Sequence, residues 1–309
     1  ALTAAEEVFC WGYNYYGQLG NGTTDHSPRP IKVSLLGPAK LISTGTHHSC
    51  AVVKKPDNTS TIQCWGRNNN YQLGNGTTTD QLLPSELLAK SESNTPIVIN
   101  YPLKSISSGG DYNCILDGTN LTPRALCWGK FYYIINNTPD TRIKYIPTTF
   151  TLNSQSFSGY FTQLVTNGSI NYGVSTTRDK LQSGVCWHYT SFGDEGSGCG
   201  YMNYDVNGVF TVGISRIQKI SLGVKRACAI YEKPVVGQLN TYSTALDCWG
   251  NGDSVPKMVT EVKEPTDIAL AKDHTCAIDK NGSLWCWGEN SYGQLGTGDL
   301  ANSSQPIKL

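Results

Sequence analysis

A short repeated segment constrains this chain more than any other feature. Cys-Trp-Gly occurs five times and Cys-Trp-His once, in repeats centred on Trp11, Trp65, Trp128, Trp187, Trp249 and Trp287. Successive tryptophans are 54, 63, 59, 62 and 38 residues apart. A period of roughly 40 to 60 residues is typical of the four-stranded blades of a β-propeller. The repeats therefore predict a single all-β propeller domain over residues 1–309.

A second repeated segment precedes every copy of Cys-Trp except the first. It is a short apolar run, followed by a cysteine among apolar residues, as in residues 41–52 and 219–230. Each copy predicts two strands, and the Cys-Trp-Gly segment predicts a third. Tails such as residues 28–33 suit a fourth strand at the sheet edge, where proline is tolerated. We therefore expect six or seven four-stranded blades, one of them incomplete at the N-terminus.

Three repeats continue into a turn rich in glycine and asparagine, at residues 13–22, 67–76 and 289–298. Closely spaced Gly and Asn are typical of positive-φ turns. With the upstream His-x-Cys-Ala sequence, these turns resemble the repeat of the regulator of chromosome condensation family, a β-propeller family. The resemblance implies a binding scaffold, because that family includes nucleotide exchange factors for small GTPases and bacterial inhibitors of β-lactamases. The repeats around Trp128, Trp187 and Trp249 keep Cys-Trp but lose the turn.

The cysteines keep their places in the repeat while the segment between them changes length. The paired positions are 14, 13, 20 and 10 residues apart, which predicts cross-strand disulfides Cys50–Cys64, Cys114–Cys127, Cys228–Cys248 and Cys276–Cys286. In the fourth repeat Tyr172 or Gly173 replaces the upstream cysteine, and we expect a compensating Cys186–Cys199 bridge. Cys10 is left unpaired, and its partner would lie upstream or downstream of this sequence or in another chain.

Disulfides persist in oxidising compartments, so we expect an extracellular, cell-surface or periplasmic protein. There is no Cys-x-x-Cys pair, and no metal site is predicted. The 24 basic and 24 acidic side chains give zero net charge, which argues against nucleic-acid binding. No apolar stretch approaches the ~18 residues of a membrane-spanning helix, so no direct membrane insertion is expected.

The sequence gives no positive sign of catalysis. No Ser-His-Asp or Cys-His arrangement and no phosphate-binding loop stands out. His48, His274 and Arg226 occupy equivalent places in three repeats, which indicates a structural role. We therefore predict a protein that is not an enzyme and needs no cofactor.

The residue that follows Trp-Gly differs in every repeat while the surrounding frame persists. Such variation predicts one face with a varied binding surface, on which aromatic residues supply contact area. Phe131, Tyr132 and Tyr133 stand where a glycine-rich turn is lost and are expected to be exposed, whereas Tyr16 and Tyr292 are expected only to pack beside their turns. The candidate ligand-binding residues are Tyr13, Tyr15, Arg67, Lys130, Phe131, Tyr132, Tyr133, His188, Tyr189, Phe192, Asn251 and Glu289.

Binding is the function that these features predict. The favoured hypothesis is an adhesion or receptor-recognition module that binds a protein or glycan and is part of a larger surface protein. An inhibitor of a secreted enzyme is the alternative. Nucleotide exchange on a small GTPase is disfavoured, because those proteins act in a reducing cytosol where disulfides are rare.

Overall fold

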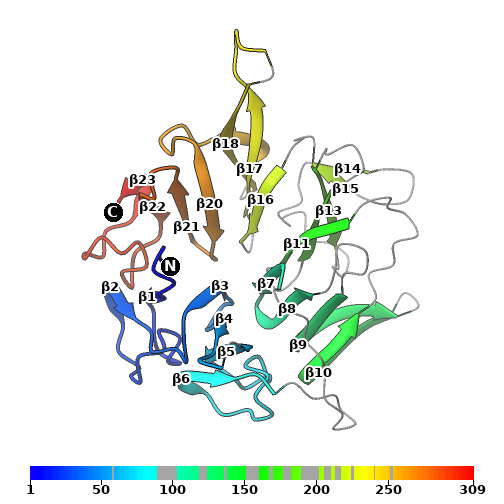
Figure 1. The fold of residues 1–309 in the computed structure, drawn as a ribbon, viewed down its shortest axis with the longest axis vertical. Helices are drawn as coiled ribbons and strands as arrows, with labels where there is room; N and C mark the ends of the chain where they lie inside the picture. Colours follow the sequence, from blue (N-terminus) through cyan, green and yellow to red (C-terminus); the bar gives the residue numbers. More distant parts are fainter. Residues whose placement is uncertain are drawn as a thin grey trace. The chain divides into compact units, whose positions relative to one another are not determined.

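The protein, described here by a computed structural model, is all-β, as predicted (Figure 1). The structure describes residues 1–57, 59–88, 103–117, 124–135, 138–150, 160–166, 170–176, 182–188, 202–204, 210–212, 217–223, 226–239, 241–250 and 253–309, and between residues 131 and 212 only the strand backbone. Contacts divide the chain into two compact units. Unit 1 is Ala1–Asn153, Thr166–Ser169 and Ser291–Leu300, and unit 2 is Ser154–Val165, Ile170–Asn290 and Ala301–Leu309. Among the described residues, no helix is long and apolar enough to cross a membrane.

Three antiparallel sheets precede residue 153. The first has two strands, β1 (Phe9–Gly12) and β2 (Ser27–Lys32). The second has four in chain order, β3 (Ala39–Thr44), β4 (His48–Lys54), β5 (Ser60–Gly66) and β6 (Gln81–Glu86). The third has β7 (Ser105–Ser108), β8 (Asp111–Asp117), β9 (Arg124–Ile135) and β10 (Thr138–Phe150), again in chain order.

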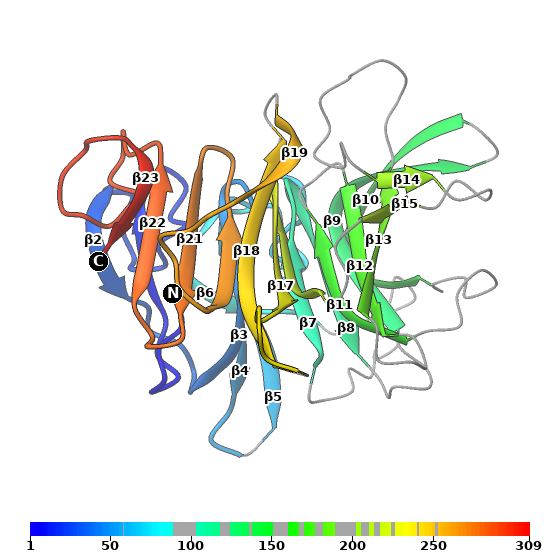
Figure 2. The ribbon, with the colours of Figure 1, turned by 90° about the horizontal axis from the view of Figure 1, so that it is seen from above.

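Three more sheets follow. One contains β11 (Tyr160–Thr166), β12 (Ile170–Thr176), β13 (Gln182–His188), β14 (Met202–Tyr204) and β15 (Phe210–Val212). The next has β16 (Ile217–Leu222), β17 (Arg226–Pro234), β18 (Tyr242–Gly250) and β19 (Asp253–Met258). The last has β20 (Pro265–Leu270), β21 (His274–Asp279), β22 (Leu284–Gly288) and β23 (Ser303–Lys308). Figure 2 shows β21, β22 and β23 one beside the next.

The predicted strand order is therefore confirmed in four sheets, each of which has two strands before the Trp-Gly strand and one after it. The total of six or seven blades and the single domain stay predictions.

Four of the predicted disulfides are confirmed. Cys50–Cys64, Cys114–Cys127, Cys228–Cys248 and Cys276–Cys286 each join directly opposed residues of neighbouring strands, with Cα atoms 4.1 Å apart. On the chain-entropy model each contributes roughly 3 kcal/mol by restricting the unfolded chain. In the fourth repeat the backbone register places Tyr172, rather than Gly173, opposite Cys186. The predicted Cys186–Cys199 bridge falls on Cys199, which lies outside the described residues.

Cys10 is a free thiol at a strand position that a disulfide-bonded cysteine occupies in the last repeat. Residues 1–9 form a turn that leads into β1. Residues 277–285 form the equivalent turn in the last repeat. Thr3 N–H donates to Glu7 O at 2.9 Å, and the equivalent bond from Asp279 N–H to Ser283 O is 3.1 Å. Cys10 thus occupies the register position of Cys286. Burial raises the pKa of the Cys10 thiol to about 11, so it stays protonated at neutral pH.

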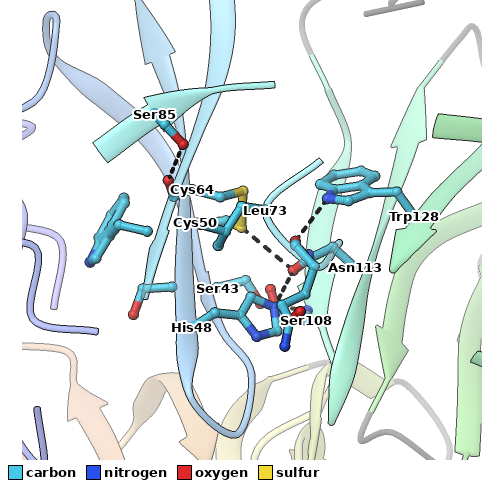
Figure 3. The surroundings of a disulfide bond; sticks show 12 residues. Ser43, His48, Cys50, Cys64, Leu73, Ser85, Ser108, Asn113 and Trp128 are labelled. Atoms are coloured by element: carbon cyan, nitrogen blue, oxygen red, sulfur yellow. Dashed lines mark hydrogen bonds between the residues drawn. A yellow bond between two sulfur atoms is a disulfide. The ribbon is translucent and has the colours of Figure 1, made fainter. Parts of the chain in front are cut away.

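A repeated hydrogen bond explains why the Trp-Gly strand and the Gln-Leu-Gly turn occur together. The indole N–H of Trp65 donates to the Gln18 carbonyl at 2.9 Å. The indole N–H of Trp128, which is labelled in Figure 3, donates to the Gln72 carbonyl at 3.0 Å. Trp11 makes the same bond to Gln294 at 3.0 Å. Each tryptophan therefore holds the turn of another repeat, and the leucine of each turn, Leu19, Leu73 or Leu295, is buried.

Asparagines at equivalent places in the repeats shape the turns from within. The Asn14 side-chain oxygen accepts a hydrogen bond from Leu19 N–H at 2.8 Å, and Asn68 accepts one from Leu73 N–H at 2.9 Å. The side-chain nitrogen of Asn68 donates to the Thr77 carbonyl at 2.8 Å. A buried side-chain amide can satisfy several backbone groups at once, which is why the turn needs asparagine at this place.

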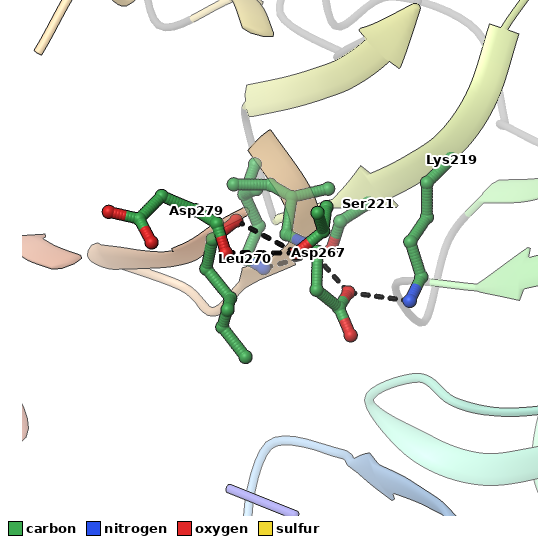
Figure 4. A network of polar contacts seen from close by, with 8 residues as sticks. Lys219, Ser221, Asp267, Leu270 and Asp279 are labelled. Carbon is green, nitrogen blue, oxygen red and sulfur yellow. Dashed lines mark hydrogen bonds and ion pairs between the residues drawn. The ribbon is translucent and has the colours of Figure 1, made fainter. Parts of the chain in front are cut away.

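A second repeated contact joins the first strands of neighbouring sheets. Within unit 1, Ser108 N–H donates to the Ser43 hydroxyl at 2.8 Å. Within unit 2, Leu270 N–H donates to the Ser221 hydroxyl at 2.8 Å, and Lys219 forms an ion pair with Asp267 at 2.6 Å (Figure 4). In both units the serine hydroxyl of the repeated Ile-Ser segment therefore accepts a hydrogen bond from a backbone N–H of the neighbouring sheet.

We expect Gly20→Ala to destabilise the protein more than Gly22→Ala. Both glycines have positive φ, +69° and +82°, so both substitutions impose similar backbone strain. A Cβ on Gly20 would lie 2.7 Å from Trp65 Nε1, whereas one on Gly22 would be no closer than 3.6 Å to Leu83. The extra cost for Gly20→Ala should be about 1 to 3 kcal/mol in urea unfolding. Equal losses would show that the turn can move away from Trp65.

His48 has the structural role expected of the repeated histidines. His48 is buried, and its Nε2 lies 2.9 Å from the Asn113 side-chain oxygen (Figure 3). The Asn113 amide nitrogen in turn donates to the Gln72 carbonyl, the acceptor of Trp128. Burial lowers the pKa of His48 to about 4, and burial lowers that of His274 to about 4 as well. Both imidazoles are neutral at pH 7.

Stability should therefore fall in mildly acidic solution. The folded pKa values lie near 4 and the unfolded value is 6.5, so the unfolded chain takes up protons first as the pH falls. The contribution of the neutral histidines is complete above pH 6.5 and is lost toward pH 4, by about 3 kcal/mol per histidine. Urea midpoints between pH 7.5 and 4.5 measure this loss. His48→Gln with His274→Gln should flatten the slope, and a slope unchanged in this double variant would contradict the assignment.

Candidate binding site

The glycine of Trp-Gly sets where the binding residues leave the sheet. Gly66 ends β5 at φ +102°, and a Cβ there would lie 2.6 Å from the His47 carbonyl oxygen. Only a glycine permits this approach, which lets Arg67 N–H donate to His47 O at 2.9 Å. Gly12 ends β1 at φ +98°. Residues 13 and 67 therefore leave their strands at equivalent points, as their shared place after Trp-Gly predicts.

Six aromatic side chains of unit 1 form one continuous group, which we call the aromatic cluster: Tyr13, Tyr15, Tyr16, His26, His47 and Tyr292. The Tyr13 ring centre lies 4.8 Å from that of His26 and 4.9 Å from that of Tyr292. Tyr16 lies 5.0 Å from both Tyr15 and His47. Such tilted and edge-to-face contacts favour a fixed arrangement of rings.

Arg67 adds a positive charge to the cluster. Its guanidinium carbon lies 4.9 Å from the centre of the Tyr16 ring, the arrangement of a cation–π contact. Burial first, and then the Arg67 charge, lower the pKa of His47, and the Asp111 carboxylate opposes them. His47 is therefore neutral at pH 7. In the described part of the chain its Nδ1 is buried with no hydrogen-bond partner.

The cluster is partly open to solvent. Tyr15 is 64% exposed and Tyr292 is 46% exposed, while Tyr13 is half-buried. Burial, followed by the neighbouring tyrosines, raises the pKa of Tyr13, so its phenol stays neutral. Rigid rings with polar ends offer contact area at small entropic cost. Among the described residues, no group of three or more His, Cys, Asp or Glu could hold a metal ion, and the arrangement suits binding.

The structure brings together three of the predicted binding residues, Tyr13, Tyr15 and Arg67. Glu289 is exposed and belongs to unit 2. Lys130 lies in β9, where it pairs with Asp111.

The other predicted residues cannot be placed in a site. Phe131, Tyr132 and Tyr133 continue β9 opposite β10, instead of forming a loop, and His188 ends β13. The side chains of these four, and the whole of Tyr189, Phe192 and Asn251, lie outside the described residues.

Sequence reasoning missed four of the six rings of the cluster. Tyr16 and Tyr292 were expected only to pack beside their turns, but both also contact rings of other segments. His26 and His47 were not predicted at all. His47 carried a usable signal, since it precedes the repeated buried His48 and so must face the opposite side of β4 or its loop. His26 carried none, because only its contact with Tyr13 reveals it.

Comparisons with known proteins agree with the repeats. Residues 6–52, 62–116 and 281–309 match the pattern of the Regulator of chromosome condensation (RCC1) repeat, and residues 266–294 match a second pattern of that repeat. The Ultraviolet-B receptor UVR8 of Arabidopsis thaliana is 23% identical over 100% of this chain and 67% of its own length. The probable E3 ubiquitin-protein ligase HERC4 of Homo sapiens is 43% identical over 28% of this chain, but only 8% of that protein is matched.

Among solved structures, Prp20p of Saccharomyces cerevisiae is similar with a TM-score of 0.65 and 14% identity. The similarity covers 99% of this chain and 86% of Prp20p. At this level of identity it shows a shared fold, the all-β propeller, and nothing more.

The electrostatics of the cluster can be tested through His47. Arg67→Gln should raise the His47 pKa toward its ordinary value without reaching it, because burial remains. Asp111→Asn should lower the pKa further, because it removes the charge that favours the imidazolium. Histidine NMR titration of both variants measures the shifts. Two shifts of the same sign, or none, would contradict this arrangement of charges.

Proposed function

The chain belongs to the regulator of chromosome condensation (RCC1)-like repeat β-propeller family, and on that premise we propose that it is an extracellular binding module that recognises a protein or glycan through the aromatic cluster. The observation that carries this proposal is the meeting of Tyr13, Tyr15, Tyr16 and Tyr292 with Arg67 at one place. Tyrosine and arginine are enriched at the energetic centres of interfaces.

The contacts within the cluster favour recognition by a surface that is already formed. Tyr13 touches four other rings, so it is fixed before any ligand arrives. Tyr15 and Tyr292 present the exposed area on either side of it. A partner would then lose little entropy of the receptor side chains on binding, which is the advantage of preorganisation. Exposed aromatic rings with phenol groups suit a sugar ring or an aromatic protein side chain equally well.

The disulfides support the extracellular part of the proposal. Four of them lie in four different sheets, and structural disulfides are rare in the cytosol. Prp20p is described as binding Gsp1p and histones. The zero net charge of this chain gives no support for a strongly basic partner such as a histone. We therefore favour an adhesion or receptor-recognition role over nucleotide exchange, and binding over catalysis.

The proposal includes an architecture of six blades within one domain. Six Cys-Trp segments occur in the sequence, and four of them lie in sheets with four strands. The whole protein's partners are also part of the proposal, because the matched segment is a small part of the ligase and two thirds of the plant receptor.

The double variant Tyr15→Ala with Tyr292→Ala tests the surface. A glycan array and a panel of purified cell-surface proteins would identify a ligand, and its affinity would then be measured by calorimetry. We expect a loss of at least about tenfold, because two exposed aromatic anchors are removed. Thermal stability should change little, since Tyr15 is 64% exposed and Tyr292 46% exposed and neither belongs to the buried core.

Tyr242→Ala is the matched control, because Tyr242 is 41% exposed and lies on β18 in unit 2. Its affinity should equal that of the parent protein. If the double variant keeps full affinity for every ligand found, the aromatic cluster is not the binding surface. Binding only to a secreted hydrolase, with inhibition, would favour the inhibitor alternative instead.

A further inference from the structure

One repeat of unit 2 lacks the turn by which three repeats of this chain contact a tryptophan. In β5–β6 the paired residues Gly66 and Gln81 are separated by residues 67–80. In β18–β19 the equivalent pair, Gly250 and Asp253, is separated only by residues 251 and 252. The register beyond the turn is unchanged, because Cys64 pairs with Ser85 and Cys248 pairs with Lys257 four residues further on. The turn is therefore missing from an otherwise intact strand pair.

The deletion removes two hydrogen-bond acceptors. In the repeat that carries the turn between β5 and β6, the Gln72 carbonyl accepts a hydrogen bond from Trp128 Nε1–H at 3.0 Å. The Gly74 carbonyl accepts one from Leu88 N–H at 2.9 Å. The equivalent donors in unit 2 are Trp287 Nε1–H and Thr260 N–H. Within the described ranges, neither has a hydrogen-bond acceptor. Two donors thus face the place of the missing turn.

The deletion also removes a buried leucine. Leu73 packs in the core with Leu87 and Trp128, and a Cβ on Gly74 would lie 2.3 Å from Leu87 and 2.7 Å from Trp128. The matching residues of unit 2, Val259 and Trp287, pack in a core that has no such leucine. The turn therefore fills volume beside Trp128 that no segment of the described chain fills beside Trp287.

An open cavity of about 270 Å³ lies at this place. Its lining includes Val259, Thr260 and Trp287, together with Arg226, Lys257 and Gln305. The volume is slightly below the ~300 Å³ at which pockets for small molecules begin. It suits one aliphatic side chain and the peptide groups beside it. All lining residues belong to unit 2, and none of them is a member of the aromatic cluster.

We propose that this cavity is a second binding site, which receives a leucine-bearing loop of a partner protein in place of the missing turn. The leucine packs against Val259 and the Trp287 ring. The backbone carbonyls beside the leucine accept hydrogen bonds from Trp287 Nε1–H and Thr260 N–H. The site therefore recognises the kind of turn that the other repeats carry within their own chain, and it does not depend on the function proposed for the aromatic cluster.

A cyclic peptide with the sequence of residues 70–76, Asn-Tyr-Gln-Leu-Gly-Asn-Gly, is the probe. Titrated into the full chain, it should shift the NMR signals of the Thr260 amide and the Trp287 indole in a saturable way. Trp287→Phe keeps an aromatic side chain but removes the indole N–H donor, and should weaken binding by at least about fivefold, the worth of one net hydrogen bond. A peptide with glycine in place of leucine should lose most of the affinity.

Trp285→Phe is the matched control. Trp285 is in the same strand, but its Nε1–H donates to Asp279 at 3.1 Å, and its loss should leave peptide binding unchanged. Tyr15→Ala with Tyr292→Ala should also leave it unchanged, so the two sites can fail separately. Absence of any shift at millimolar peptide, or equal affinity of Trp287→Phe and Trp285→Phe, would overturn the proposal. If the chain self-associates and Trp287→Phe abolishes this association, the cavity binds a second copy of the chain, and the proposal of a separate partner protein is wrong.

Discussion

The hydrogen bond from a tryptophan indole to a glutamine carbonyl is the interaction on which the well-formed repeats depend. It is found at Trp11, Trp65 and Trp128, each time with the Gln of a Gln-Leu-Gly turn from another repeat. The bond requires a turn that brings its backbone close to the ring, and the glycine after the leucine permits that approach. It also places the leucine in the core. A single contact therefore couples the turn, the tryptophan and the packing between sheets.

The same turns create the surface available for recognition. Tyr13, Tyr15 and Tyr16 belong to the loop whose Gln18 holds Trp65, and Tyr292 belongs to the loop whose Gln294 holds Trp11. Because the inner end of each loop is fixed by its buried leucine and its hydrogen bond, the outer end can vary without loss of the fold. Where the loop is deleted, as after Gly250, the surface gains a cavity in place of a projecting loop.

The disulfides and the buried histidines support this arrangement in different ways. Each disulfide joins the Trp-Gly strand of a sheet to the strand that precedes it. It acts mainly by restricting the unfolded chain. His48 instead acts between sheets, through Asn113 and the carbonyl of Gln72. Burial keeps it neutral, so the polar contact is made without a buried charge, whose desolvation is costly.

The sequence alone determined what is periodic in this protein. Spacings that repeat along the chain predict the strand order, the four disulfides and the edge position of the proline-bearing strands. They do so because the same residue types pack in the same places in each sheet. Part of the site, Tyr13, Tyr15 and Arg67, also followed, since variable residues at a fixed point of a repeat lie at equivalent ends of strands. Tertiary structure alone decided which of these residues meet: Tyr292 reaches Tyr13 across 279 positions of the chain, and His26 joins them from the far side of a loop. The cavity beside Trp287 could not be predicted either. The sequence shows that the turn is missing, but only the packed structure shows whether other side chains fill its place.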